Sequence, residues 1–453
     1  MISAGTGQRT ITPTNGSPIA GLLEPRSARS VADDLYVRAF VLSSDEQTVA
    51  LVLCDLICLA KATIDLAKVR IEAISGIAPS HVMVSCTHTH TAPCTTPLFA
   101  SNPDPEYVAW VATQIAEAVI LATTRLLPAQ IATESAAIEG VCFNRRYHMA
   151  DGTVVFNPGI QNPDIVAVAG PTDPDVTVMR VETVAGTPIA LWASLVLHCV
   201  GTDRGDVISA DYFGVFSQVA QQFLGGNCMG MLTNGASGNI NNIDVTSETT
   251  SVKASEQARR VASAVVAAAV QATTMVARHD ETSITATTFP MTLHRRAVSA
   301  QDVVRARHIL GGDTGQANSL ERFSFEQGQR IPASQLVPYD KEVLLLADMP
   351  EWGTSDIQLI RIGDLQLVAI PGEVFVEFGL TIKEASPTPH TAIVSLANDY
   401  VGYMPTAEAF SQGGYETWGA RSAWTAPGTG EAICQEIVAR MPLLDQRQPM
   451  QHH

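Results

Sequence analysis

The chain has 453 residues, which is enough for two or three average domains or for one large α/β domain. Apolar residues make up 46% of the sequence and charged residues 16%, so the chain can bury a sizeable core. The formal net charge is −17 and no run of Lys and Arg stands out, which argues against nucleic acid and an anionic membrane surface as partners.

Residues 1–11 are polar and show no charged segment followed by an apolar core, so we predict no secretory signal. The apolar stretches 189–200 and 261–277 are shorter than the roughly 20 residues that a membrane-spanning helix needs. The eight cysteines form no CxxC pair and several lie in apolar strands, which is typical of reduced core thiols. The sequence therefore predicts a cytoplasmic protein without a transmembrane segment, and it leaves the oligomeric state open.

Strand-like and helix-like segments alternate along the chain, which is the pattern of an α/β protein. We predict strands over residues 35–42, 48–59, 81–86, 176–184, 189–197, 284–293 and 392–397. We predict helices over residues 64–74, 107–127, 254–276 and 300–310 and from about Glu373 onward, and a hairpin over 358–370 through Gly363-Asp364.

Sequence signals mark several ends of these elements. Gly76 and Pro79 end the helix over 64–74, and Asp104 with Pro105 introduces the helix over 107–127. Residues 311–338 are rich in Gly, Gln and Ser, and apolar segments resume on both sides of them. We therefore predict a surface excursion at 311–338 and one catalytic domain over residues 1–453.

The strongest local motif is residues 87–91, which read Thr-His-Thr-His-Thr directly after a predicted strand. On an extended segment, side chains two positions apart point to one side, so His88 and His90 would project together. Imidazole is a favoured zinc ligand. Taken alone, the pair is compatible both with a metal site and with an ordinary polar loop.

Two further segments place metal-binding side chains at the ends of apolar strands. His198 ends the strand over 189–197, where it is either a hydrogen-bonded core histidine or a ligand, and a polar loop containing Arg204 follows it. Glu373 lies where an apolar strand breaks before a predicted helix. Its carboxylate can favour the helix N-terminus or bind a metal.

A Gly/Asn-rich loop over residues 234–242 follows another predicted strand. Backbone amides in such loops can bind anions or an oxyanion. Ser237 invites comparison with a nucleophile, but its surroundings do not form the G-x-S-x-G elbow. A turn without chemistry is the alternative reading.

In this order, the segments resemble the neutral/alkaline ceramidase family. The resemblance covers nearly the whole chain, and it rests on residues 11–13, 20–21, 34–39, 53–56, 87–91, 143–146, 170–176, 198, 208–211, 234–242, 371–373 and 400–416. It implies an α/β fold with mixed β-sheets flanked by helices, like the catalytic domain of neutral ceramidase. The chain is similar to a short member that lacks the C-terminal immunoglobulin-like domain.

The resemblance also implies a Zn²⁺ site and an active site around it. The family's zinc ligands fall on His88, His198, Glu373 and Tyr403. The catalytic positions fall on His90, Arg145, Tyr415 and Asn241, and we expect substrate contacts from Ser237, Asn239 and Arg204.

One departure from the family changes the expected mechanism. Aligned on Gly238, the stretch that carries the family's catalytic serine places Asn241 at the serine position. An asparagine amide is not a nucleophile, so we expect a water activated by the metal to attack instead. His90 would act as general base or acid, Tyr415 and Arg145 would stabilise the oxyanion, and Asn241 would orient substrate or water.

The predicted function is therefore zinc-dependent hydrolysis of an amide (N-acyl) bond, or of an ester or lactone, in a small carbonyl-containing substrate. One alternative is a metal-dependent isomerase, epimerase or lyase on the same scaffold, since Arg145, Arg146 and Arg204 could bind a carboxylate. A catalytically inactive binding protein is a second alternative, because the serine is absent.

Overall fold

The computed structural model describes residues 1–453 except 15, 249–251, 312–322, 325–328, 332–334 and 446–453. Most of the predicted surface excursion at 311–338 thus lies outside the described residues. Within it, the short strands β19 (Phe323–Ser324) and β20 (Gln329–Arg330) pair, and helix α6 (Leu336–Ala347) begins near its end.

The largest sheet has eight strands in the order β16-β14-β13-β8-β1-β5-β6-β7. Most neighbours run antiparallel, but the pairs β14/β16 and β6/β7 at the two edges are parallel. The strands are β16 (Met229–Asn234), β14 (Pro188–Leu195), β13 (Asp175–Thr183), β8 (Leu127–Ala137), β1 (Ile2–Thr10), β5 (Tyr36–Ser43), β6 (Thr48–Cys54) and β7 (Val82–Cys86).

A second, four-stranded sheet is also mixed, in the order β18-β21-β22-β24. Its strands are β18 (Ile284–His294), β21 (Trp352–Ile362), β22 (Leu365–Ala369) and β24 (His390–Val394). The predicted hairpin is confirmed, because β21 and β22 pair antiparallel across Gly363, whose φ of 56° suits a tight turn.

The alternation of side chains along the strands produces the layers. Val37 and Val41 of β5 pack against helices α1 (Lys61–Ser75) and α2 (Pro105–Thr123). Phe40, which points to the other face of β5, lies in a core shared with the four-stranded sheet. The two sheets therefore pack face to face.

Helices cover the outer faces of both sheets. Helices α3 (Asp211–Leu224) and α4 (Ala254–Thr274) pack on β13, β14 and β16, and α7 (Val376–Ala385) and α9 (Thr429–Arg440) pack on the four-stranded sheet. The remaining helices are α5 (Ala300–Leu310) and α8 (Ala407–Gln412). The predicted class, α/β with mixed sheets flanked by helices, is confirmed.

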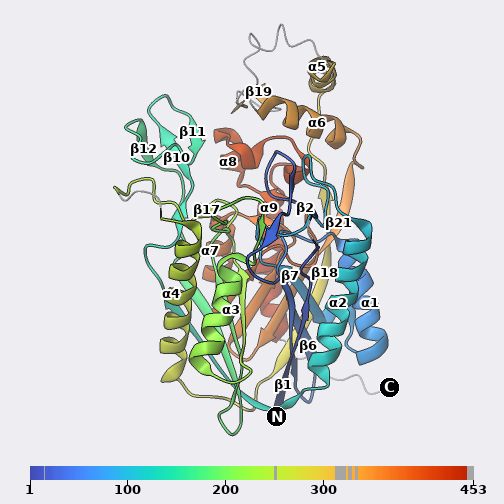
Figure 1. The fold of residues 1–453 in the computed structure, drawn as a ribbon, viewed down its shortest axis with the longest axis vertical. Coiled ribbons are helices and arrows are strands. Elements are labelled where there is room, and N and C mark those ends of the chain that lie inside the picture. The colour runs from blue at the N-terminus through green and yellow to red at the C-terminus, as the bar shows by residue number, and fades with distance from the viewer. Residues whose placement is uncertain (15, 249–251, 312–322, 325–328, 332–334, 446–453) are drawn as a thin grey trace.

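Figure 1 shows the long strands running along the vertical axis, with the N-terminus at the lower end. The small sheet of β10 (Arg146–Met149), β11 (Val154–Phe156) and β12 (Ile165–Val168) lies at the opposite end, as do α5 and α6. No described helix is long and apolar enough to cross a membrane. All eight cysteines are free, and only Cys142 and Cys199 are more than marginally exposed.

Several predicted boundaries are wrong. The helix predicted over 107–127 ends at Thr123, and strand β8 begins at Leu127. The strand predicted over 48–59 ends at Cys54. No helix begins at Glu373, because that residue forms the short strand β23 (Glu373–Val374), which pairs with β25 (Tyr403–Met404), and α7 starts only at Val376.

Candidate metal centre and active-site cavity

The Thr-His-Thr-His-Thr segment leaves β7 in a turn rather than in the extended form that the sequence predicted. His88 has a φ of 68°, which is strained for a residue with a Cβ. Its amide donates to the carbonyl of Leu56, which holds the turn. The two imidazoles still converge, since His88 Nε2 lies 3.2 Å from His90 Nε2.

The other two predicted ligands reach the same point from different elements. His198 follows β14, and its Nε2 lies 3.1 Å from His88 Nε2. Glu373 of β23 places its Oε2 3.2 Å from His88 Nε2 and 3.9 Å from His198 Nε2. Residues widely separated in the sequence are thus brought into one buried cluster.

The hydrogen bonds of the histidine rings define what the cluster can bind. His88 Nδ1 lies 2.9 Å from the carbonyl oxygen of Ile57, and His198 Nδ1 lies 3.3 Å from that of Ser237. A carbonyl oxygen only accepts, so each Nδ1 carries a proton, and in the neutral tautomer each Nε2 presents a lone pair. Two such Nε2 atoms 3.1 Å apart can share a cation, either a proton or a metal ion.

The Glu373 carboxylate completes this set of acceptors. Its Oε2 is buried and receives no hydrogen bond from the described residues, whereas its Oε1 accepts one from the Tyr400 hydroxyl at 2.9 Å. A buried carboxylate oxygen without a donor is costly unless a cation pairs with it. His88, His90 and His198 offer ligand atoms within 4.8 Å of one another, so this group could hold a metal ion.

The electrostatics of the cluster favour metal-binding protonation states. Burial lowers the pKa of His90 to about 3 and that of His198 well below its ordinary value, with the neighbouring cations and imidazoles adding to the shift. Burial alone would raise the pKa of Glu373, but His88, Tyr403 and Arg145 outweigh it and hold that pKa below its usual range. His90, His198 and Glu373 are therefore ready to act as ligands near neutral pH.

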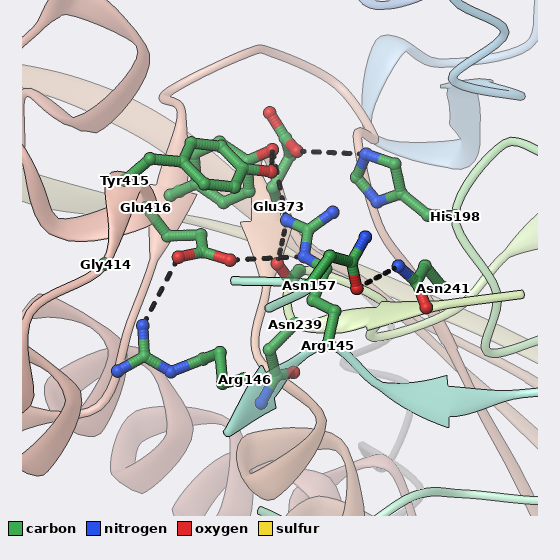
Figure 2. A network of polar contacts seen from close by, with 12 residues as sticks. Arg145, Arg146, Asn157, His198, Asn239, Asn241, Glu373, Gly414, Tyr415 and Glu416 are labelled. Carbon is green, nitrogen blue, oxygen red and sulfur yellow. Dashed lines mark hydrogen bonds and ion pairs between the residues drawn. The ribbon is translucent and has the colours of Figure 1, made fainter. Parts of the chain in front are cut away.

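Arg145 occupies the centre of a polar network beside the cluster (Figure 2). Its Nε donates to Glu416 Oε1 at 3.1 Å, and its Nη2 donates to the carbonyl of Gly238 and to Tyr403 Oη at 3.3 Å. The Tyr403 and Tyr415 hydroxyls lie 3.0 Å apart. The fixed guanidinium is thus held next to two phenols.

A cavity of about 640 Å³ opens onto this cluster. His88, His90, His198 and Glu373 line it together with Arg145. Its apolar wall consists of Leu22, Leu23, Ile57, Leu98, Phe99, Val154, Val155, Phe156, Val200, Ile243 and Trp418. A polar cluster beside an apolar wall fits a small molecule that carries both a polar and an apolar group.

The remaining predicted site residues divide into two groups. Tyr403, Tyr415 and Asn241 line the cavity. Ser237 and Asn239 are buried and are not among its lining residues; Ser237 Oγ donates to Asn234 Oδ1, and the Asn239 amide donates to Glu377.

Of the three arginines considered for carboxylate binding, only Arg145 lines the cavity. Arg146 is buried and pairs with Glu416. Arg204 is exposed and pairs with Asp206. Of these three arginines the cavity wall thus contains one, which weakens the case for an isomerase, epimerase or lyase that binds a carboxylate through all of them.

Sequence reasoning missed Tyr400, Glu416 and Asn157. Tyr400 lies three residues before Tyr403, and its hydroxyl donates to Glu373 Oε1 and so orients that carboxylate. Glu416 follows Tyr415 directly and holds both Arg145 and Arg146. No sequence signal pointed to Asn157.

Two solved structures are similar to this chain. The crystal structure of neutral ceramidase from Pseudomonas aeruginosa matches with a TM-score of 0.72 and 18% identity, over 99% of this chain and 75% of that chain. A ceramidase complexed with C2 matches with a TM-score of 0.72 and 19% identity, over 100% of this chain and 76% of that chain. The fold is that of neutral ceramidase.

The neutral-ceramidase resemblance inferred from the ordered motifs is thus confirmed for the fold. No family model and no curated protein sequence matches the chain. Of the segments that carried the resemblance, residues 87–91, 143–146, 198, 234–242, 371–373 and 400–416 each contribute to the lining of the cavity. The roles of the individual residues remain predictions.

Proposed function

We propose that this protein is a zinc-dependent hydrolase that cleaves an amide (N-acyl) bond in a small molecule, with esters and lactones as related substrates. The observation that carries the proposal is the buried cluster in the wall of the cavity, where the Nε2 atoms of His88 and His198 face each other beside Glu373 Oε2. The shared fold with an enzyme named neutral ceramidase supports an N-acyl bond as the target. Residues 1–453 would form one catalytic domain.

His88, His198 and Glu373 would hold the ion, with Tyr403, which hydrogen-bonds to Glu373, as a fourth ligand. Nitrogen and carboxylate donors in this number suit Zn²⁺ better than Mg²⁺ or Ca²⁺, which prefer oxygen ligands. When bound, zinc would polarise the substrate carbonyl and make water a competent nucleophile near neutral pH.

The protein's own groups would carry out the remaining steps. His90, whose Nε2 lies 3.2 Å from His88 Nε2 at the edge of the cluster, would hold the attacking water and accept its proton as charge develops. Arg145 would bind the developing negative charge on the carbonyl oxygen, and the Tyr415 hydroxyl would donate to the same oxygen. The apolar wall would receive the acyl group and exclude water from it.

Water is the proposed nucleophile because Asn241 stands in the cavity wall at the position where the family's serine is expected. Asn241 lines the cavity, and its amide cannot attack a carbonyl. Ser237 Oγ is committed to Asn234 at 2.7 Å and is buried. Asn241 would instead orient the substrate or the water.

The test is hydrolysis of a panel of N-acyl para-nitroanilides, with sugar acids as the comparison set for isomerase or lyase activity. We expect amide cleavage that a chelator abolishes, that Zn²⁺ restores and that Ser237→Ala leaves intact. Loss of activity in Ser237→Ala together with a covalent acyl adduct would contradict the water mechanism.

A further inference from the structure

Asn157 follows β11 in the cavity wall, and its backbone is strained. Its φ is 40°, and Pro158 follows it, which disfavours helical conformations at this position. The main-chain amide of Asn157 donates to the main-chain carbonyl of Arg145 at 2.9 Å. Strain of this kind persists where the surrounding structure imposes it, and it clusters at functional sites.

The hydrogen bonds around Asn241 fix the orientation of the Asn157 side chain. Asn241 Oδ1 accepts from the main-chain amide of Ile243 at 3.0 Å, so Asn241 Nδ2 must face the other way. That nitrogen donates to Asn157 Oδ1 at 3.0 Å. The contact therefore requires an oxygen from Asn157 and turns Asn157 Nδ2 away from Asn241, as Figure 2 shows.

Asn157 Nδ2 has no acceptor among the described residues, although Asn157 lines the same cavity as Arg145 and His198. Two N–H donors are thus available to whatever occupies the cavity. Arg145 and Asn157 both line the cavity, and a main-chain hydrogen bond joins them. Their side-chain donors therefore lie in the same part of the cavity wall.

We propose that Asn157 donates from Nδ2 to the carbonyl oxygen of the substrate as negative charge develops there, and that it holds Asn241 through Oδ1. This inference rests on the proposed amide hydrolysis. It makes Asn157 a catalytic residue, and it explains why an asparagine, which tolerates the left-handed conformation, stands at this strained position.

Asn157→Asp separates the two roles. The aspartate keeps an oxygen for the Asn241 amide and tolerates the same φ, but it replaces both donors with an acceptor. The matched control is Asn162→Asp, which makes the same change in charge in the same loop on a residue that is not among those lining the cavity. Asn157→Gly removes both functions and relieves the strain.

With N-octanoyl para-nitroanilide as the probe, we expect kcat/KM of Asn157→Asp to fall about 100-fold, mainly through kcat, as for a lost oxyanion donor. Zinc content and melting temperature should match the wild type, and Asn162→Asp should remain active. Asn157→Gly should lose at least as much activity.

Near-wild-type kcat/KM in Asn157→Asp would overturn the inference, and loss in Asn157→Gly alone would show that Asn157 only positions Asn241. Parallel loss of zinc and activity in Asn157→Asp would also overturn it, because the metal site would then be the cause. A wild-type protein that cleaves no N-acyl substrate would instead contradict the proposed function itself.

Discussion

His88 and His198 each use one ring nitrogen to hold a main-chain carbonyl and leave the other facing the cluster. The backbone contact fixes the tautomer and the ring orientation, as outer-shell contacts do at metal centres. Gly21 lies close to the His90 ring, since a Cβ at Gly21 would stand 2.7 Å from it, so any larger residue there would displace that ring. Small changes in these supports would therefore disturb the cluster.

Tyr415→Phe tests the proposed oxyanion donor. The substitution removes one hydroxyl and keeps the ring that packs against Phe156 at 5.0 Å between centroids. We expect kcat to fall by about 10- to 100-fold with little change in zinc binding.

Tyr107→Phe is the control for Tyr415→Phe, because it removes a hydroxyl that donates to the Ile11 carbonyl away from the cavity. It should lower stability by about 1 kcal/mol and leave kcat unchanged. Equal kcat in Tyr415→Phe and the wild type would remove Tyr415 from the mechanism.

Most residues of the cluster could be predicted from the sequence, because their side chains are common metal ligands and because the motifs follow one another in the order of a known family. His88, His90, His198 and Glu373 follow strand-like runs, and their register matched a known family. Asn157 could not be found in this way, because its position depends on a cavity wall that the neighbouring loop forms with Asn241. Ser237 and Asn239 were expected at the substrate for their residue types, but local contacts turn them away.

At the scale of elements, β1 was not predicted because its polar and glycine-rich sequence lacks apolar alternation. Close packing against helix α2 fixes the position of β1 instead. A Cβ on Gly7 would lie 2.1 Å from the Ala118 carbonyl oxygen of α2, so only glycine allows the helix to approach the strand. Conversely, the apolar strands β5, β6 and β14 and the hairpin β21/β22 were predicted because their patterns are local.

Gly7→Ala should destabilise the protein by about 3 kcal/mol, since backbone must move to admit the methyl group. Gly353→Ala in β21 is the matched control, because its Cβ would meet only Trp424 at an ordinary 3.8 Å. It should change the free energy of unfolding by less than about 0.5 kcal/mol. Chemical denaturation measures both, and equal effects would refute the close approach.

Lys68 of α1 should impart a pH dependence to stability. Burial, with Lys61 nearby, lowers its pKa from 10.5 to about 8, and its Nζ donates to Asn398 Oδ1 at 2.9 Å. Between these pH values the unfolded chain binds more protons than the folded chain, so the free energy of unfolding should rise with pH, by up to about 3 kcal/mol.

Lys68→Met keeps the apolar stem and removes the titration. Asn398 Oδ1 still accepts from the Val84 amide in this variant. The difference in unfolding free energy between variant and wild type should therefore change between about pH 8 and pH 10.5. A constant difference across this range would contradict the lowered pKa of Lys68.

At the scale of the whole molecule, the candidate metal centre brings together residues that belong to the two different sheets. His88 and His198 follow strands of the eight-stranded sheet, while Glu373 lies beyond β22 of the four-stranded sheet. A bound ion would therefore link both sheets and stabilise only the folded chain.

Zinc should raise the melting temperature of chelator-treated protein. At a free concentration about 100 times the dissociation constant, binding adds about 2.7 kcal/mol to the free energy of unfolding. Mg²⁺, which prefers oxygen ligands, is the control and should have little effect. An identical shift with both ions, or none with zinc, would argue against the nitrogen-rich site.

The most direct measurement is a calorimetric titration of Zn²⁺ into chelator-treated protein, comparing the wild type with His198→Ala and with the exposed control His294→Ala. The account predicts one equivalent of tightly bound zinc per chain in the wild type and in His294→Ala, and binding weakened by at least about 100-fold in His198→Ala. Absence of zinc binding in the wild type, or unchanged binding in His198→Ala, would contradict it.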